Sequence, residues 1–232
     1  MEKGLTTAYT DPRFGSEWQN TIKEGCESFG VTIGKRSFEF FSIHASLLVQ
    51  WNRKVNLTAI KDPFEIAVKH FIDSAALLPY IPPRARVLDI GTGAGFPSVV
   101  LKILAPGLDM VCVDASRKKI SFVKESIRQC GLESIKAIHA RTEELSEDEA
   151  CQNSFDLVTS RAFASLDQFV EQAAPFLAPN GTILAMKGKS CAGKSRGSDM
   201  NRGYLSEVFD YSLPFLQDKR CIIKVRLPDE SS

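Results

Sequence analysis

The sequence predicts an α/β protein with a doubly wound, mostly parallel sheet, a helical extension before it and an antiparallel hairpin at its C-terminal end. Three observations predict this architecture. The first 83 residues contain three amphipathic helical patterns. From residue 84, five short apolar runs alternate with helical segments, as they do in βαβ units. Two final apolar runs lie too close together for a crossover helix between them.

The first part of the chain is predicted to be helical. Apolar residues recur three and four positions apart in three stretches, at residues 16–29, 37–51 and 63–78. A Pro-Pro pair at residues 82–83 ends this part. We therefore expect an N-terminal helical extension over residues 1–83, followed by one compact α/β domain over residues 84–232.

The second part is predicted to form the sheet. Five apolar runs have the length of buried strands, at residues 86–90, 110–113, 135–139, 155–159 and 182–186. Helical patterns separate them at residues 97–104, 116–130 and 166–177. The last two runs, 205–213 and 221–227, are joined by a short loop that contains Pro214. We expect them to pair as an antiparallel hairpin on the sheet edge.

Composition and charge exclude several classes of protein. With 44% hydrophobic and 25% charged residues, a chain of 232 residues can bury a core without metals or disulfides. No apolar run approaches the ~20 residues of a membrane span, and the start of the chain lacks a secretory signal. The six cysteines form no C-x-x-C pair and have no histidines at zinc spacing. We expect a soluble cytoplasmic protein, monomeric and without a metal site.

A charge gradient runs along the chain beneath the formal net charge of +1. Residues 187–232 carry nine basic and six acidic side chains, whereas residues 84–186 carry eleven basic and thirteen acidic ones. A basic C-terminal part can bind a polyanion such as nucleic acid, although an ordinary solvated surface has the same composition.

A glycine-rich turn joins the first predicted strand to the next helix. Residues 87–97 read VLDIGTGAGFP, a D-x-G-x-G-x-G pattern that begins at Asp89. Glycine allows a tight turn against which a ligand can lie. A dinucleotide fingerprint, G-x-G-x-x-G, would require a glycine at Phe96 instead. Asp89 either orients backbone amides or receives the ammonium group of a ligand through water.

Asp114 ends the second predicted strand, beside the glycine turn at the carboxyl edge of a doubly wound sheet. A carboxylate there can accept hydrogen bonds from both ribose hydroxyls of an adenosine ligand. The alternative is that Asp114 only caps the helix that begins near Ser116.

Residues 188–195, GKSCAGKS, match the phosphate-loop pattern G-x-x-x-x-G-K-[ST]. That loop binds phosphate only where a helix begins at its Lys-Ser end. The residues that follow, RGSDMNRG, have no apolar periodicity, and no second carboxylate-bearing strand for magnesium follows them. A nucleotide hydrolase is therefore not favoured. We expect residues 188–203 to form a mobile basic loop near a nucleic-acid substrate.

Five segments, found in order between about Phe38 and Arg226, are together far more specific than any one of them. They are residues 51–58 (WNRKVNLT), 69–74 (KHFIDS), 95–97 (GFP), 159–162 (TSRA) and 186–188 (MKG). In these segments the chain resembles the bacterial small-subunit ribosomal RNA guanine-N7 methyltransferases, also called glucose-inhibited division protein B.

The resemblance implies a Rossmann-like class I methyltransferase fold, with the cofactor S-adenosyl-L-methionine bound by residues 84–232. It implies 16S rRNA, alone or in the small ribosomal subunit, as partner and N7 of guanine 527 as the methylated atom. The cofactor-binding residues that it implies are Gly91, Gly93, Gly95, Phe96, Asp114, Thr142, Glu143 and Arg161. Among these, Thr142 and Glu143 would lie at the adenine. The sequence departs from the family at Ser98, where a further glycine is common, and at Thr142, where alanine is frequent.

Methylation of guanine N7 needs no general base, because N7 carries a lone pair and no proton. Positioning and electrostatics must then supply the rate. Arg161 is the expected catalytic residue, since its guanidinium can hold the cofactor carboxylate or donate to guanine O6. The alternative is a structural ion pair of Arg161 with Asp156 or Asp167.

Three further residues are candidates for substrate contact: Asn56, His70 and Lys187. Asn56, with Trp51, could bind single-stranded RNA, although a Trp at a helix end usually packs in the core. His70 and Asp73 share a helix face and could contact each other or the glycine turn. Lys187 could contact phosphate or be solvated. No role is assigned to His44 or His139.

Two other functions remain open from the residues alone. A methyltransferase for a small molecule would share every cofactor residue and differ only in its substrate segments. A nucleotide-binding regulatory protein could use either glycine-rich loop without transferring a methyl group.

Overall fold

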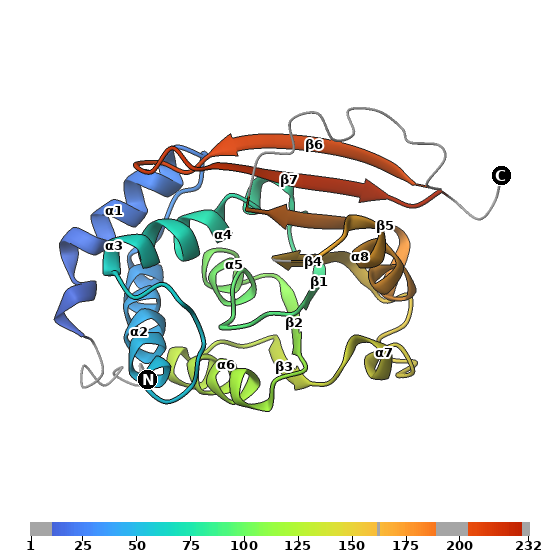
Figure 1. Cartoon of the computed structure of the whole chain (residues 1–232), viewed down its shortest axis with the longest axis horizontal. Helices are drawn as coiled ribbons and strands as arrows, with labels where there is room; N and C mark the ends of the chain where they lie inside the picture. Colours follow the sequence, from blue (N-terminus) through green and yellow to red (C-terminus); the bar gives the residue numbers. More distant parts are fainter. Residues whose placement is uncertain (1–10, 162, 189–203, 229–232) are drawn as a thin grey trace.

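Seven strands form one sheet in the computed structural model, which describes residues 11–161, 163–188 and 204–228 (Figure 1). Along the sheet their order is β3-β2-β1-β4-β5-β7-β6. The bounds are β1 (Arg86–Ile90), β2 (Asp109–Asp114), β3 (Ile135–His139), β4 (Phe155–Arg161), β5 (Leu177–Lys187), β6 (Leu205–Ser212) and β7 (Lys219–Arg226).

The sheet is doubly wound, as predicted. β1 to β5 pair in parallel, and β1 has β2 on one side and β4 on the other. The order of the strands therefore reverses at β1, which is where α/β sheets bind ligands at their carboxyl edge. β7 pairs antiparallel with β5 and with β6. The predicted C-terminal hairpin is thereby confirmed.

Helices cover both faces of the sheet. They are α5 (Ser98–Leu104), α6 (Arg117–Cys130), α7 (Thr142–Leu145) and α8 (Leu166–Ala173), which is followed by the 3-10 turn η5 (Ala174–Phe176). The helix predicted over residues 166–177 ends early because Pro175 cannot continue it. α7 was not predicted.

Within the described residues, the N-terminal extension contains the 3-10 turn η2 (Pro12–Phe14) and the helices α1 (Ser16–Glu27) and α2 (Lys35–Asn52). The helix predicted over residues 63–78 is divided into α3 (Pro63–Ile66), the π-helical segment η3 (Ala67–Ile72) and α4 (Asp73–Ala75), before the turn η4 (Leu78–Tyr80). A π-helical segment changes the direction of the side chains that follow it. The segment contains His70 and ends just before Asp73.

The extension and one face of the sheet share a hydrophobic core. Phe41 of α2 and Phe71 of η3 are fully buried in the same cluster as Val87 of β1 and Val99 of α5. Figure 1 shows α1 to α4 standing beside α5 and α6 on that side. A second cluster under α8 covers the opposite face. Within the described residues, no helix is long and apolar enough to cross a membrane.

Candidate active site

The glycine turn connects β1 to α5, and two of its three glycines are needed for different reasons. Gly91 has φ +73°, and a Cβ added there would meet no atom within 4 Å. The backbone at Gly91 therefore borders open space. Gly95 has φ +79°, and a Cβ there would lie 2.6 Å from Cγ2 of Val99. This glycine lets α5 pack closely against the turn.

Asp114 faces the glycine turn from the end of β2. Its Oδ2 accepts a hydrogen bond from the Gly93 N–H at 3.0 Å, and its side chain is buried. Its Oδ1 accepts a hydrogen bond from the Ser116 N–H at 2.8 Å, just before α6 begins. The contact with Ser116 agrees with the alternative that Asp114 supports the approach to α6, while the contact with Gly93 places the same carboxylate beside the turn.

Asp89 lies beneath the turn and is completely buried. By distance and angle neither of its carboxylate oxygens has a hydrogen bond to any described residue, although the hydroxyls of Thr92 and Ser98, which bond each other at 2.6 Å, lie near it. Burial raises the pKa of Asp89 to about 6, while the nearby hydroxyls of Thr92 and Ser98 and the charge of Arg161 oppose this shift. A buried carboxylate without a bonded partner is poised to accept a cationic group.

Arg161 ends β4 and is held from several sides. Its Nη1 donates to the Lys69 carbonyl at 2.9 Å, and its Nη2 lies 2.9 Å from Nδ1 of His70. Its guanidinium carbon lies 5.4 Å from the centre of the Phe96 ring. Oδ2 of Asp73 lies 3.6 Å from Nη1. Arg161 therefore joins the extension to the glycine turn.

The expected alternative partners of Arg161 were wrong. Asp156 stands near the other end of β4, about 16 Å away along an extended strand, and accepts a hydrogen bond from the Arg86 N–H at 2.7 Å. Asp167 accepts one from the Tyr204 hydroxyl at 2.6 Å. The ion pair that forms is with Asp73 of α4 instead.

His70 positions Arg161 and the ring of Phe96. The His70 imidazole and the Phe96 ring stack with their centres 4.5 Å apart and 11° between their planes. Burial and the charge of Arg161 lower the pKa of His70 to about 2, so the imidazole is neutral at physiological pH. Because arginine has no acceptor, Nδ1 must accept the hydrogen bond from Arg161. Nε2 then carries the proton and donates to Oγ1 of Thr58 at 2.9 Å.

Asp73 connects this cluster to the C-terminal hairpin. Its Oδ1 accepts a hydrogen bond from the Tyr211 hydroxyl of β6 at 2.7 Å. Nε of Arg220, on β7, lies 3.9 Å from the same oxygen. Burial raises the pKa of Asp73, and the two arginines and Tyr211 oppose that effect. His70 and Asp73 thus lie on the same side of their helical segment, as predicted, and both contact Arg161.

The other predicted site residues lie around this centre. Thr142 and Glu143 begin α7, in the segment that follows β3. Lys187 ends β5, and its Nζ lies 5.6 Å from the centre of the Phe163 ring. Asn56 is exposed in the loop after α2, while Trp51 packs against Phe122. The phosphate-loop match and the predicted basic loop lie outside the described residues beyond Gly188.

Comparison with known proteins identifies the family. Residues 38–223 match the family "GidB: rRNA small subunit methyltransferase G". The chain is 43% identical over 209 residues to the "Ribosomal RNA small subunit methyltransferase G" of Geobacter sp. (strain M21), covering 88% of this chain and 95% of that one. It is 35% identical over 207 residues to the protein of that name from Acetivibrio thermocellus (strain ATCC 27405), covering 88% and 86%.

The chain belongs to this rRNA small subunit methyltransferase G family. Its fold is shared with more distant solved structures. A "SAM dependent methyltransferase from Aquifex aeolicus" superposes with a TM-score of 0.56 at 13% identity, over 75% of this chain and 97% of that one. A "ribosomal protein L11 methylase" from Lactobacillus delbrueckii subsp. bulgaricus superposes with a TM-score of 0.52 at 16% identity, over 69% and 79%. The class I methyltransferase fold expected from the sequence is confirmed.

Several residues around the glycine turn and Arg161 were assigned no role from the sequence. Tyr211 and Arg220 belong to a hairpin predicted only as a sheet edge, and Thr58 ends one of the five family segments without a role of its own. His44 is buried, contacts the Phe96 ring edge-on at 5.0 Å, and lies 2.6 Å from Oγ of Ser126. Each reaches the site through a contact distant in sequence, which local patterns do not reveal.

Proposed function

We propose that this rRNA methyltransferase transfers a methyl group from S-adenosylmethionine to N7 of guanine 527 in 16S rRNA. The observation that carries the proposal is the arrangement at the carboxyl edge of the sheet. There the glycine turn has open backbone at Gly91. The Asp114 carboxylate and the Arg161 guanidinium lie beside the same turn. Family membership favours rRNA over a small-molecule substrate and over a nucleotide-binding regulatory role.

The described residues fit the methyl donor. The space beside Gly91 admits a nucleoside close to the backbone, and Asp114 stands where it can accept hydrogen bonds from ribose hydroxyls. The buried Asp89 carboxylate, which has no bonded partner among the described residues, suits the donor's ammonium group through a water molecule. Thr142 and Glu143 are assigned to the adenine.

S-adenosylmethionine, when bound, supplies an electrophilic methyl group on its sulfonium. The protein then has to hold guanine N7 in line with that methyl group, and no residue has to remove a proton. Arg161 has five N–H groups, of which two are engaged by the Lys69 carbonyl and His70. Nη1 also faces Oδ2 of Asp73 at 3.6 Å, and we assign the N–H groups that remain to guanine O6 or to the donor's carboxylate.

We assign direct contact with the reacting centre to Arg161 and a positioning role to His70. Both nitrogens of His70 are already engaged, by Arg161 and Thr58, so the imidazole acts by fixing the guanidinium. We assign contact with the RNA to Asn56, which is exposed, and to Lys187, which is half-buried.

Methyl transfer to ribosomal RNA tests the proposal. Purified protein, labelled S-adenosylmethionine and small ribosomal subunits from a strain lacking the enzyme should give label in 16S rRNA. Chemical cleavage at N7-methylguanine should then map the label to guanine 527. The Asp114→Ala variant, once circular dichroism has shown that it is folded, should give little label because the ribose hydroxyls lose their hydrogen-bond acceptor. Label in adenine, or at another guanine, would contradict the assignment.

The cellular setting and organisation of the chain are also part of the proposal. An enzyme of rRNA works where ribosomes assemble, so we place it in the cytoplasm, and we propose that it acts as a monomer. The division into an extension over residues 1–83 and a cofactor-binding domain over residues 84–232 stays a prediction.

A further inference from the structure

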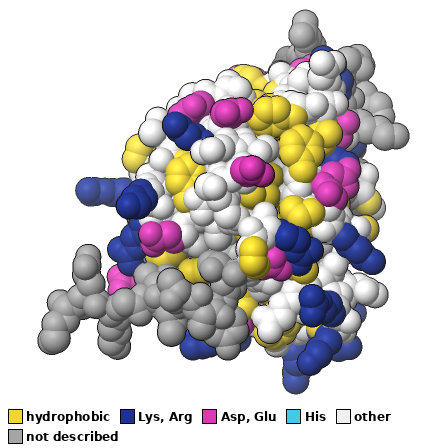
Figure 2. Space-filling model, turned by 90° about the vertical axis from the view of Figure 1, so that its left-hand side faces the viewer, with side chains coloured by type: hydrophobic (Ala, Val, Ile, Leu, Met, Phe, Trp, Pro, Cys, Tyr) yellow, Lys and Arg dark blue, Asp and Glu magenta, His cyan; other side chains and the backbone are white. Residues whose placement is uncertain are grey.

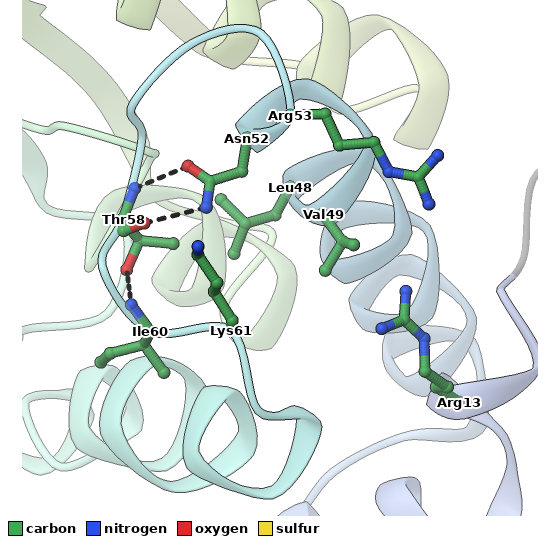
Figure 3. Close-up of a pocket in the computed structure, with 8 residues that line it drawn as sticks. All are labelled: Arg13, Leu48, Val49, Asn52, Arg53, Thr58, Ile60 and Lys61. Carbon is green, nitrogen blue, oxygen red and sulfur yellow. Dashed lines mark hydrogen bonds between the residues drawn. The ribbon is translucent and has the colours of Figure 1, made fainter.

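A hollow of ≈ 280 Å³ lies between the C-terminal end of α2 and the segment that leads into α3 (Figure 3). We call it the α2 hollow. It is lined by Arg13, Leu48, Val49, Asn52, Arg53, Thr58, Ile60 and Lys61. Three of these side chains are basic, three are apolar and none is acidic. A concave site with apolar walls and a few cations suits a ligand that has both a ring and a negative charge.

Two of the three cations have no hydrogen bond or ion pair with any residue that the structure describes. These are Arg53 and Lys61, both exposed. Arg53 lies near enough to the Asp11 carboxylate to help lower the pKa of that group. Arg13 differs, because both oxygens of Asp11 bind its guanidinium at 2.6–3.1 Å. Figure 3 shows the Lys61 side chain reaching from the loop toward α2. Lys and Arg side chains also gather on the lower right of the face drawn in Figure 2.

The hollow is built before any ligand arrives. The Asn52 side chain donates to the Thr58 carbonyl at 2.9 Å and accepts from the Thr58 N–H at 3.1 Å (Figure 3). It also accepts from the Leu57 N–H at 2.8 Å. These three hydrogen bonds fix the loop that forms one wall against α2. Little conformational freedom is then lost when a ligand binds.

The hollow is also connected to the reacting centre. Thr58 lines it and bonds His70 through its hydroxyl, and His70 in turn bonds Arg161. Two side-chain contacts therefore separate a wall of the hollow from Arg161. A chain that places one nucleotide at Arg161 would have its neighbours within reach of the hollow.

We propose that the α2 hollow binds a nucleotide of the RNA substrate close to the methylated guanine. Arg53 and Lys61 hold its phosphate, and Leu48, Val49 and Ile60 contact its ribose or base. Single-stranded RNA is recognised by such a combination of cations on phosphate and packing against unstacked rings. This inference rests on the proposed function, because it takes rRNA as the substrate.

Steady-state methylation of small ribosomal subunits tests the inference. An Arg53→Ala/Lys61→Ala variant should raise KM for the subunits by about tenfold per lost charge-assisted contact, leaving KM for S-adenosylmethionine unchanged. The slope of log(kcat/KM) against log salt should become shallower by about 0.7, since the two cations hold one phosphate and each neutralised phosphate contributes about 0.7. Lys136→Ala, an exposed charge loss on β3, is the matched control and should change neither quantity.

A filling variant separates occupancy of the hollow from long-range charge attraction. Val49→Trp keeps the charges and fills the space, so it should raise KM for the subunits without changing the salt slope. If the charge variant behaves like Lys136→Ala, or if Val49→Trp is folded and has wild-type KM, the inference is overturned. Absence of rRNA methylation by the wild-type chain would instead reject the proposed function itself.

Discussion

At the scale of single residues, the site depends on carboxylates whose surroundings differ. Asp114 already has N–H donors from the turn and from the start of α6, and 10% of its side chain stays exposed. Asp89 is completely buried and has no hydrogen-bonded partner among the described residues. Its raised pKa means that the folded protein holds the charged form at a cost, which a cationic ligand can offset.

This cost predicts a pH dependence of stability. The pKa of Asp89 is about 6 in the folded protein, against the ordinary aspartate value of 3.8 that applies to the unfolded chain. The folded state therefore binds the proton more tightly, and the stability from this group is complete below pH 3.8 and is lost as pH rises to about 6. Measured by urea unfolding, the free energy of unfolding of the wild type should fall by about 3 kcal/mol relative to that of Asp89→Asn as the pH rises from 3.8 to about 6.

The comparison with Asp89→Asn isolates this carboxylate, because the other titrating groups, Asp73 included, are present in both proteins. A difference in unfolding free energy that stays constant from about pH 4 to about pH 7 would mean that Asp89 is not a strained, buried acid.

At the scale of elements, regular patterns were predictable and short or irregular ones were not. The five parallel strands and the hairpin follow from apolar runs and the length of their connections. α7 has four residues, too few to show a helical period. The π-helical segment around His70 resembles an α-helix in sequence. Its geometry depends on packing against Arg161 and Phe96, which no local pattern contains.

The hairpin is expected to influence catalysis through one hydroxyl group. Tyr211→Phe removes only the hydrogen bond to Asp73, so it should lower stability by about 1.5–3 kcal/mol, as for bonds to charged groups. Since Asp73 also faces Arg161, kcat for rRNA methylation should fall while KM for S-adenosylmethionine changes little. Stopped-time assays with labelled methyl donor, together with thermal unfolding, measure both effects.

Tyr80→Phe is the matched control. The Tyr80 ring packs 4.7 Å from Phe209 of the same hairpin, and its hydroxyl has no hydrogen bond to a described residue. This variant should retain wild-type kcat and nearly wild-type stability. Equal kcat for the Tyr211 and Tyr80 variants would show that the hairpin serves the fold alone.

At the scale of the whole molecule, the site lies where the extension meets the sheet. Arg161 contacts His70, 91 positions earlier, and Tyr211 contacts Asp73 across 138 positions. The two parts share a hydrophobic core that brings these residues together. The sequence indicated both parts and most site residues, but their docking depends on side-chain packing between distant segments. Arg161 was therefore named from its place at the end of a predicted strand, whereas its ion-pair partner, Asp73, was not predicted.

The central claim is that the turn after β1 and the carboxylate of Asp114 form the seat of the methyl donor. A crystal structure with S-adenosylhomocysteine, the product of the donor, tests it most directly. The nucleoside should lie against Gly91, with its ribose hydroxyls within hydrogen-bond distance of Asp114 and its adenine beside Thr142. A nucleoside bound elsewhere, or an Asp114 side chain turned away from the ribose, would contradict the account.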